Sequence, residues 1–211
     1  MTAVDAFGKA FSSLVPSGRD ARTDQLQERL MNYPGVQAAS VDELLRQVRN
    51  YLRLAIEQED LVTSRNEMFQ MVKKEEDKPN RGEFLIVGGD KNAERDPNLP
   101  SLKRPDGGFF HFALTCRPQG RGALELLAYN FELVFPAMPD AEEGALREFV
   151  RFDLSSPTGE ATKNIERGLR SHMHPGRDDI QIPAAALTWL ELLDLFVYRL
   201  KPRDPEKRRV A

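Results

Sequence analysis

Residues 109–135 read FFHFALTCRPQGRGALELLAYNFELVF, and this stretch decides the fold. Two runs rich in aromatic and aliphatic residues, 109–116 and 124–135, flank the turn sequence Gln119-Gly120-Arg121-Gly122. Two such runs joined by a glycine-containing turn predict a β-hairpin. Three further segments have strand character and extend the sheet to about five strands: 83–87, 146–154 and 168–174.

Helical patterns flank the predicted sheet on both sides. Ser40 and Glu43 have the spacing of a capping box, and apolar residues then recur every three or four positions, which predicts a helix. A second helix is expected over 61–74, followed by a charged turn or linker over 73–81. Thr188 and Glu191 repeat the capping spacing and begin a broadly apolar helix that we expect to pack on the sheet.

These elements predict the α+β class: an N-terminal helical region, a mostly antiparallel sheet of about five strands and a C-terminal helix packed on the sheet. Residues 1–39 are expected to form a flexible arm with a short helix at 24–31. Residues 40–211 form a single α+β domain, with a helical part over 40–78 and a sheet part over 83–200. The long polar segment between Asp90 and Gly108 is predicted to be a loop, and loops of this length are often functional.

Composition excludes several classes of protein. The 211 residues carry a formal net charge of -3, which argues against a generic nucleic-acid binder, although RNA at a local basic cleft is still compatible. Cys116 is the single cysteine, so no disulfide forms within the chain. We find no secretory signal and no run of apolar residues long enough to span a membrane, and we therefore expect a cytoplasmic protein.

Polar side chains alternate with the apolar ones along each predicted strand. If the apolar sides align against the helices, the opposite face of the sheet gathers all three histidines of the chain together with charged residues. This predicted polar face consists of His111, Asn130, Glu132, Arg151, Asp153, Arg170, His172 and His174. A solvated face of an antiparallel sheet is normally polar, but this one contains no lysine.

The segment His172-Met173-His174-Pro175-Gly176-Arg177-Asp178-Asp179 concentrates residues that can carry chemistry. Two histidines at positions i and i+2 of a strand project to the same side, which suits two ligands of one divalent metal such as zinc or manganese. After the Pro-Gly turn, Asp178 or Asp179 can return as a carboxylate ligand. Alternatively, His111 is the third ligand, with Asp153 or Glu132 as general base.

Residues 172–175 resemble the His-x-His-Pro core of MPN/JAMM-type metalloproteases. That family continues with a Ser-x-x-Asp that supplies a further ligand, whereas this chain has Ile180-Gln181-Ile182-Pro183-Ala184 in the corresponding stretch. The resemblance is confined to these four residues and assigns no family.

Two other interpretations use the same segment. Arg170, His172, His174 and Arg177 resemble the residue sets of small prokaryotic ribonuclease toxins, in which histidines act as general acid and base and arginine stabilises the phosphate. In this metal-free nuclease the catalytic residues are Arg170, His172, His174 and Asp178, whereas His172, His174 and Asp179 are the ligands of the metal-dependent version. In the third interpretation the cluster is only structural, and the chain is a non-catalytic interaction or regulatory module with a protein partner or self-association. Because no catalytic motif is complete, the sequence alone favours this module.

Overall fold

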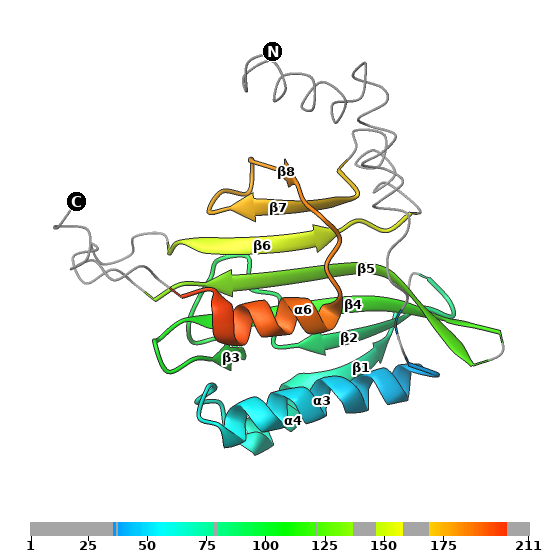
Figure 1. The fold of residues 1–211 in the computed structure, drawn as a ribbon, viewed down its shortest axis with the longest axis horizontal. Helices are drawn as coiled ribbons and strands as arrows, with labels where there is room; N and C mark the ends of the chain where they lie inside the picture. Colours follow the sequence, from blue (N-terminus) through cyan, green and yellow to red (C-terminus); the bar gives the residue numbers. More distant parts are fainter. Residues whose placement is uncertain are drawn as a thin grey trace, which may run out of the picture.

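The computed structural model describes residues 36, 38–77, 80–120, 122–136, 147–157 and 169–201. The expected arm and short helix of residues 1–39 lie almost entirely outside these ranges. Within the described part, no helix is both long enough and apolar enough to cross a membrane. The fold is a mixed α+β arrangement in which helices pack against one face of an antiparallel sheet (Figure 1).

Among the described residues the sheet contains eight strands, so the sequence-based expectation of about five was too low. The strand order is β1-β2-β4-β5-β6-β7-β8, every neighbouring pair is antiparallel, and β3 adds a short ladder to β4. Along the chain the elements are α3 (Val41–Glu57), α4 (Arg65–Met71), β1 (Val72–Glu76), β2 (Phe84–Gly88), β3 (Leu102–Lys103), β4 (Phe109–Gln119), β5 (Ala123–Val134), β6 (Phe149–Leu154), β7 (Ser171–Pro175), β8 (Ile182–Pro183), α6 (Trp189–Asp194) and the π-helix η2 (Leu195–Arg199).

Side-chain capping explains where the helices begin. Ser40 accepts a hydrogen bond from the Glu43 backbone at 3.1 Å, but the Glu43 carboxylate binds Arg46 instead of closing the predicted capping box. Ser64 starts α4 with a complete capping box, so the helix expected from residue 61 begins at Arg65. This helix ends at Met71, and residues 73–76 of the predicted turn or linker belong instead to the edge strand β1, while the turn lies at residues 81–82.

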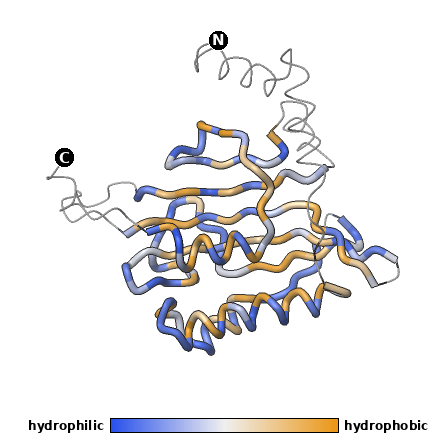
Figure 2. The backbone as a smooth tube through the Cα atoms, viewed as in Figure 1, coloured by the Kyte–Doolittle hydropathy of each residue, from blue (hydrophilic) through white to orange (hydrophobic). Residues whose placement is uncertain are grey.

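The apolar faces of the strands align as predicted. Phe110, Phe112 and Leu114 of β4 join alternate residues of β5 and β6 and the buried faces of α3 and α6 in one core. Figure 2 shows this concentration of apolar residues along the central strands. The register of β4 and β5 shifts between Thr115 and Cys116, because Thr115 pairs with Ala128 and Cys116 with Leu126, which leaves Leu127 as the extra residue of a β-bulge on β5.

The C-terminal helix is structural, as the sequence predicted. Leu193 is fully buried and Val197 is 4% exposed, whereas Leu190 on the other side of the helix is 45% exposed. The complete capping box of Thr188 and Glu191 fixes the start of α6.

Arg104 links the C-terminal end of this helical segment to the segment that follows β3. Its guanidinium donates hydrogen bonds to the backbone oxygens of Phe196 at 2.8 Å and Leu200 at 2.5 Å, and it pairs with Asp106 at 2.6 Å. The last turns of the helix are therefore tied to the segment that follows β3.

Candidate metal centre

The strand register arranges the polar side chains in two rows across β4, β5, β6 and β7. One row is His111, Glu132, Arg151 and His174, and the neighbouring row is Ala113, Asn130, Asp153 and His172. The structure thus brings together the predicted polar face, except that Arg170 precedes β7, which begins at Ser171 rather than at the expected residue 168.

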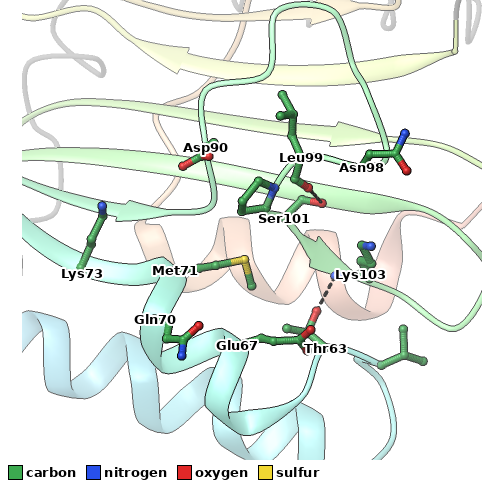
Figure 3. A pocket seen from close by; sticks show the side chains of 12 residues that line it. Thr63, Glu67, Gln70, Met71, Lys73, Asp90, Asn98, Leu99, Ser101 and Lys103 are labelled. Atoms are coloured by element: carbon green, nitrogen blue, oxygen red, sulfur yellow. Dashed lines mark hydrogen bonds between the residues drawn. The ribbon is translucent and has the colours of Figure 1, made fainter.

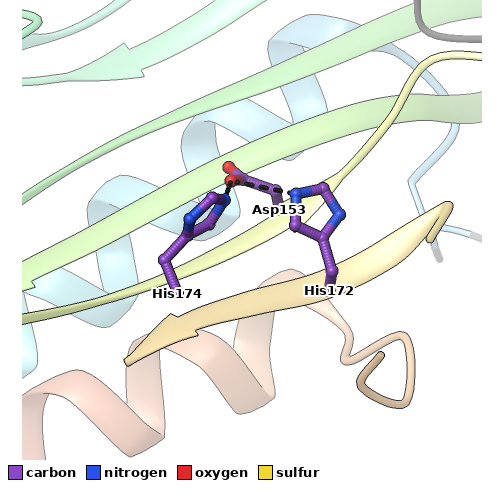
Figure 4. Close-up of side chains that lie close together, drawn as sticks. All are labelled: Asp153, His172 and His174. Carbon is purple, nitrogen blue, oxygen red and sulfur yellow. Dashed lines mark ion pairs between the residues drawn. The ribbon is translucent and has the colours of Figure 1, made fainter. Parts of the chain in front are cut away.

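His172 and His174 lie on the same side of β7, as their spacing predicted, and converge on Asp153 of β6 (Figure 4). The Nε2 atom of His174 lies 3.2 Å from Asp153 Oδ2, and the Nε2 atom of His172 lies 3.6 Å from the same oxygen. The imidazole centroids are 5.1 Å apart. Both histidines are buried, at 3% and 2% exposure, while Met173 between them packs against the core.

Each imidazole is oriented by a backbone carbonyl. His172 Nδ1 lies 2.7 Å from Leu169 O, and His174 Nδ1 lies 3.3 Å from Arg177 O. Because a carbonyl oxygen only accepts hydrogen bonds, both Nδ1 atoms carry the proton. In a neutral imidazole of this tautomer the Nε2 atom presents a lone pair toward Asp153, which a cation between the two atoms would make attractive, whereas a protonated imidazole donates from Nε2 to the carboxylate. Metal-binding histidines have this outer-shell hydrogen bond.

Asp153 is held in place by partners on its own and neighbouring strands. Its Oδ2 accepts from Arg151 Nε at 2.9 Å, and its Oδ1 accepts from the Asn130 amide. Burial alone would raise the pKa of this carboxyl, but hydrogen bonds and ion pairing with His174, Arg151 and Asn130 outweigh it and lower the pKa below its usual value. Burial lowers the pKa of His172 despite the nearby Asp153 carboxylate. An ionised carboxylate therefore faces a neutral His172 imidazole.

The rest of the polar face forms an ionic network around Arg151. Its guanidinium lies 2.9 Å from Asp153, 2.5 Å from Asp178 and 3.5 Å from Glu132. Arg95, from the loop between β2 and β3, lies 3.2 Å from Glu132 and 3.0 Å from Asp178. Arg95 and Arg151 therefore pair with three carboxylates, those of Glu132, Asp153 and Asp178. The formal charges of these five groups sum to one negative charge, which a bound cation would balance.

The residues predicted as site residues are only partly brought together. Among the described residues, the carboxylate within reach of both histidines is that of Asp153. Asp178 binds Arg95 and Arg151, and these bonds lower its pKa against the opposing effect of desolvation. Asp179 pairs with the exposed Arg177 at 2.7 Å. The alternative third ligand, His111, is not part of the group, although it lies on the same face.

Arg95 is the member of the network that sequence analysis missed. It lies in the polar loop that was noted only for its length, and its φ angle of 55° is rare for a residue other than glycine. Its guanidinium stacks 3.4 Å from the centroid of the Phe149 ring. The Asn92 side chain bonds both the N–H and the carbonyl of Asp96 and so shapes the turn that contains Arg95. The spacing of Asn92 and Asp96 was therefore the feature of the sequence that could have indicated this turn.

Two cavities lie near these loops. One, of about 460 Å³, adjoins the network and is lined by Glu132, His111, Arg95 and Arg151. The other, of about 520 Å³, lies between α4 and residues 98–103 (Figure 3). Its buried polar side chains are already satisfied, because Thr63 accepts from the Lys103 backbone at 2.7 Å and Ser101 donates to Leu99 O at 3.1 Å.

Comparison with protein-family models, curated proteins and solved structures finds no match to this chain. The function is therefore argued from the geometry and chemistry of the site.

Proposed function

We propose that this chain binds a divalent transition metal, zinc or manganese, through Asp153, His172 and His174. The observation that carries the proposal is the orientation of the two imidazoles. Each Nδ1 donates to a backbone carbonyl, and both Nε2 atoms face one oxygen of one carboxylate. All three candidate ligand atoms lie within 4.8 Å of one another, which is compatible with coordination to a single ion after small side-chain shifts.

Two histidines and one carboxylate leave a coordination position for water. A metal held by three protein ligands supplies Lewis acidity and a bound water of lowered pKa, the chemistry of metal-dependent hydrolysis. The chain's own residues would orient the ligands: Arg151 and Asn130 hold Asp153, and the carbonyls of Leu169 and Arg177 hold the imidazoles. We therefore propose a metal-dependent hydrolase as the reaction class.

The same contacts disfavour the metal-free nuclease. The Nε2 atoms of both histidines point at a carboxylate, which would repel the phosphate that a nuclease has to bind. The guanidinium of Arg177 is exposed and paired with Asp179. The non-catalytic module remains the alternative, because a proton between His174 and Asp153 would make the cluster a structural ion pair.

The test is metal content and zinc titration on protein purified without a histidine tag. We expect one zinc or manganese per chain, and cobalt(II) substitution should give the visible absorption of a site with nitrogen and oxygen ligands. His172→Ala should weaken zinc binding at least about 100-fold, because removing a direct ligand costs more than the roughly 10–100-fold typical of an outer-shell partner.

His111→Ala is the matched control, because His111 lies on the same face but outside the three-residue group. It should leave the zinc affinity unchanged. A wild-type titration without saturable binding would refute the metal site and leave the non-catalytic module as the better interpretation, and so would an equal loss in His111→Ala.

A further inference from the structure

The carboxylate of Asp178 lies between the guanidinium groups of Arg95 and Arg151, and all three side chains line the cavity of about 460 Å³. Arg95 Nη2 donates to the two carboxylate oxygens at 3.1 and 3.0 Å, and Arg151 Nη1 donates to Oδ1 at 2.5 Å. The Asp178 side chain is 56% exposed, whereas those of Arg95 and Arg151 are 11% and 20% exposed. An exposed carboxylate thus occupies a binding position made by two largely buried arginines.

Both guanidinium groups are also held by contacts that do not involve Asp178. Arg95 stacks 3.4 Å from the centroid of the Phe149 ring, and Arg151 Nε donates to Asp153 at 2.9 Å. Groups that are oriented in advance lose less conformational freedom when a ligand binds. The pair is therefore preorganised for a planar carboxylate, whose two oxygens match guanidinium donors.

The loop that carries Arg95 has a defined shape as well. Gly89 has a φ angle of 90°, and a Cβ atom there would lie 2.8 Å from Pro100 O. Only glycine allows the chain to turn this closely over the sheet. Two hydrogen bonds between Asn92 and Asp96 then fix the turn that presents Arg95. The backbone therefore holds this arginine at the cavity.

The contact made by Asp178 is the one that a ligand can replace. Exposed ion pairs contribute little to stability, because water solvates the separated charges nearly as well. Asp178 lies in the turn after β7, so its side chain can rotate into solvent while the strands stay paired. A carboxylate from solution, placed at the same position, would accept the same hydrogen bonds from Arg95 and Arg151.

We propose that the cavity binds a small molecule with a carboxylate group, which displaces Asp178 and pairs with Arg95 and Arg151. The apolar part of the ligand lies over Val87 and Ala113, two half-buried residues of β2 and β4 that pair in register and line the cavity. A volume of about 460 Å³ accommodates a single ring or a short aliphatic chain beside the carboxylate.

The charges around the cavity favour an anion. Lys91, Arg95 and Arg151 line it together with Glu132 and Asp178, so the lining has an excess of one positive charge. The excess rises to two when Asp178 leaves, and an incoming carboxylate restores the original balance. The position of the Asp178 carboxylate identifies the group, because it shows that a carboxylate fits between the two arginines at hydrogen-bond distance.

Benzoate and benzamide have the same shape but differ in charge, and they test the proposal on protein kept in EDTA. We expect saturable benzoate binding at millimolar or lower concentration in saturation-transfer NMR and calorimetry. Benzamide should bind about tenfold or more weakly, because it lacks the charge that pairs with the two arginines. Phenyl phosphate, which carries the same ring, should bind no more tightly than benzoate.

Two neighbouring aspartates give a matched pair of variants. Asp178→Ala removes the internal competitor and should raise the benzoate affinity about threefold to sixfold, since no aspartate then occupies the binding position. Asp179→Ala removes the same charge from the same turn, but Asp179 pairs with Arg177 and is not part of the cavity lining, so the affinity should stay unchanged. A gain in affinity cannot arise from misfolding of the variant.

Absence of saturable benzoate binding would overturn the proposal, and so would equal binding of benzamide. Tighter binding of phenyl phosphate would refute the assignment of a carboxylate ligand. An affinity of Asp178→Ala no higher than that of Asp179→Ala would show that Asp178 does not occupy the ligand position. Because the protein is kept free of metal, a failed zinc titration with intact benzoate binding would refute the metal site alone.

Discussion

Asp153→Asn is the substitution that examines the candidate site most directly. The carboxylate of Asp153 is 16% exposed and accepts hydrogen bonds from Arg151 and Asn130, with His174 at 3.2 Å. Asparagine keeps the shape but removes the charge, and it places an N–H₂ group among donors. Asp178→Asn is a matched control, because Asp178 pairs with the same arginine while its side chain is 56% exposed.

The two substitutions should differ in magnitude. Breaking a buried ion pair leaves its partner uncompensated and costs about 3–5 kcal/mol, partly offset here because Arg151 keeps Asp178 and Glu132. We expect Asp153→Asn to lower the free energy of unfolding by about 3 kcal/mol. Exposed ion pairs contribute about 0–1 kcal/mol, so Asp178→Asn should lower it by at most about 1 kcal/mol.

Urea unfolding at pH 7.5 in EDTA measures both effects without any contribution from bound metal. In a thermal melt, a loss of about 3 kcal/mol corresponds to a decrease in Tm of about 6–12 °C for a chain of this size. An equal or larger loss in Asp178→Asn would refute the view that Asp153 organises the network. A stabilised Asp153→Asn variant would show that the desolvation of the carboxylate outweighs its partners.

Three further outcomes concern the fold and the pH dependence of stability. Leu193→Ala should cost about 2–5 kcal/mol in urea unfolding, whereas Leu190→Ala on the exposed side of the same helix should stay within about 0.5 kcal/mol. Arg104→Met should cost about 2–4 kcal/mol, because it leaves two carbonyl oxygens of the C-terminal helical segment without their donor, and a loss below about 1 kcal/mol would contradict this. His111 has a pKa of about 4 in the folded chain against about 6.5 when unfolded, so the unfolded state takes up the proton first as the pH falls. The free energy of unfolding is therefore unaffected by His111 above pH 6.5 and falls by about 3 kcal/mol in total as the pH decreases toward 4. A His111→Asn variant should show a correspondingly flatter pH profile of stability.

The polar face was predictable because strand alternation is a local property of the sequence. His172 and His174 share a side whatever their neighbours are, and the same rule placed Arg151 and Asp153, also two residues apart, on one face. The antiparallel order of β4, β5, β6 and β7 then brought these side chains into rows. The order follows the chain, so simple neighbour pairing was enough to anticipate it.

The identity of the carboxylate facing the histidines was not predictable from spacing. Asp178 and Asp179 are close to His174 in sequence, but the turn that follows β7 directs them to Arg95, Arg151 and Arg177. Asp153 reaches the histidines through strand pairing, since it lies directly opposite His172. Proximity along the chain favoured Asp178 and Asp179 over Asp153, because sequence spacing contains no information on the register between strands.

The missed strands are short or charged. β1 reads Val-Lys-Lys-Glu-Glu, a composition without strand pattern that is typical of an edge strand protected from further pairing. β3 and β8 have two residues each, too few for any periodicity. Their pairing depends on contacts with β4 and β7 that become visible only in the folded chain.

A third row on the same face shows that the fold itself does not require buried charges here. Phe109, Val134 and Phe149 pair in register one step away from the row of His111 and Glu132, and they form a small buried apolar cluster. The sheet can therefore bury this face with apolar side chains, which is usually at least as stable as buried ion pairs. The two adjoining rows instead carry six ionisable side chains. Stability gives no reason for that choice, whereas the proposed binding of a cation by Asp153, His172 and His174 would give one.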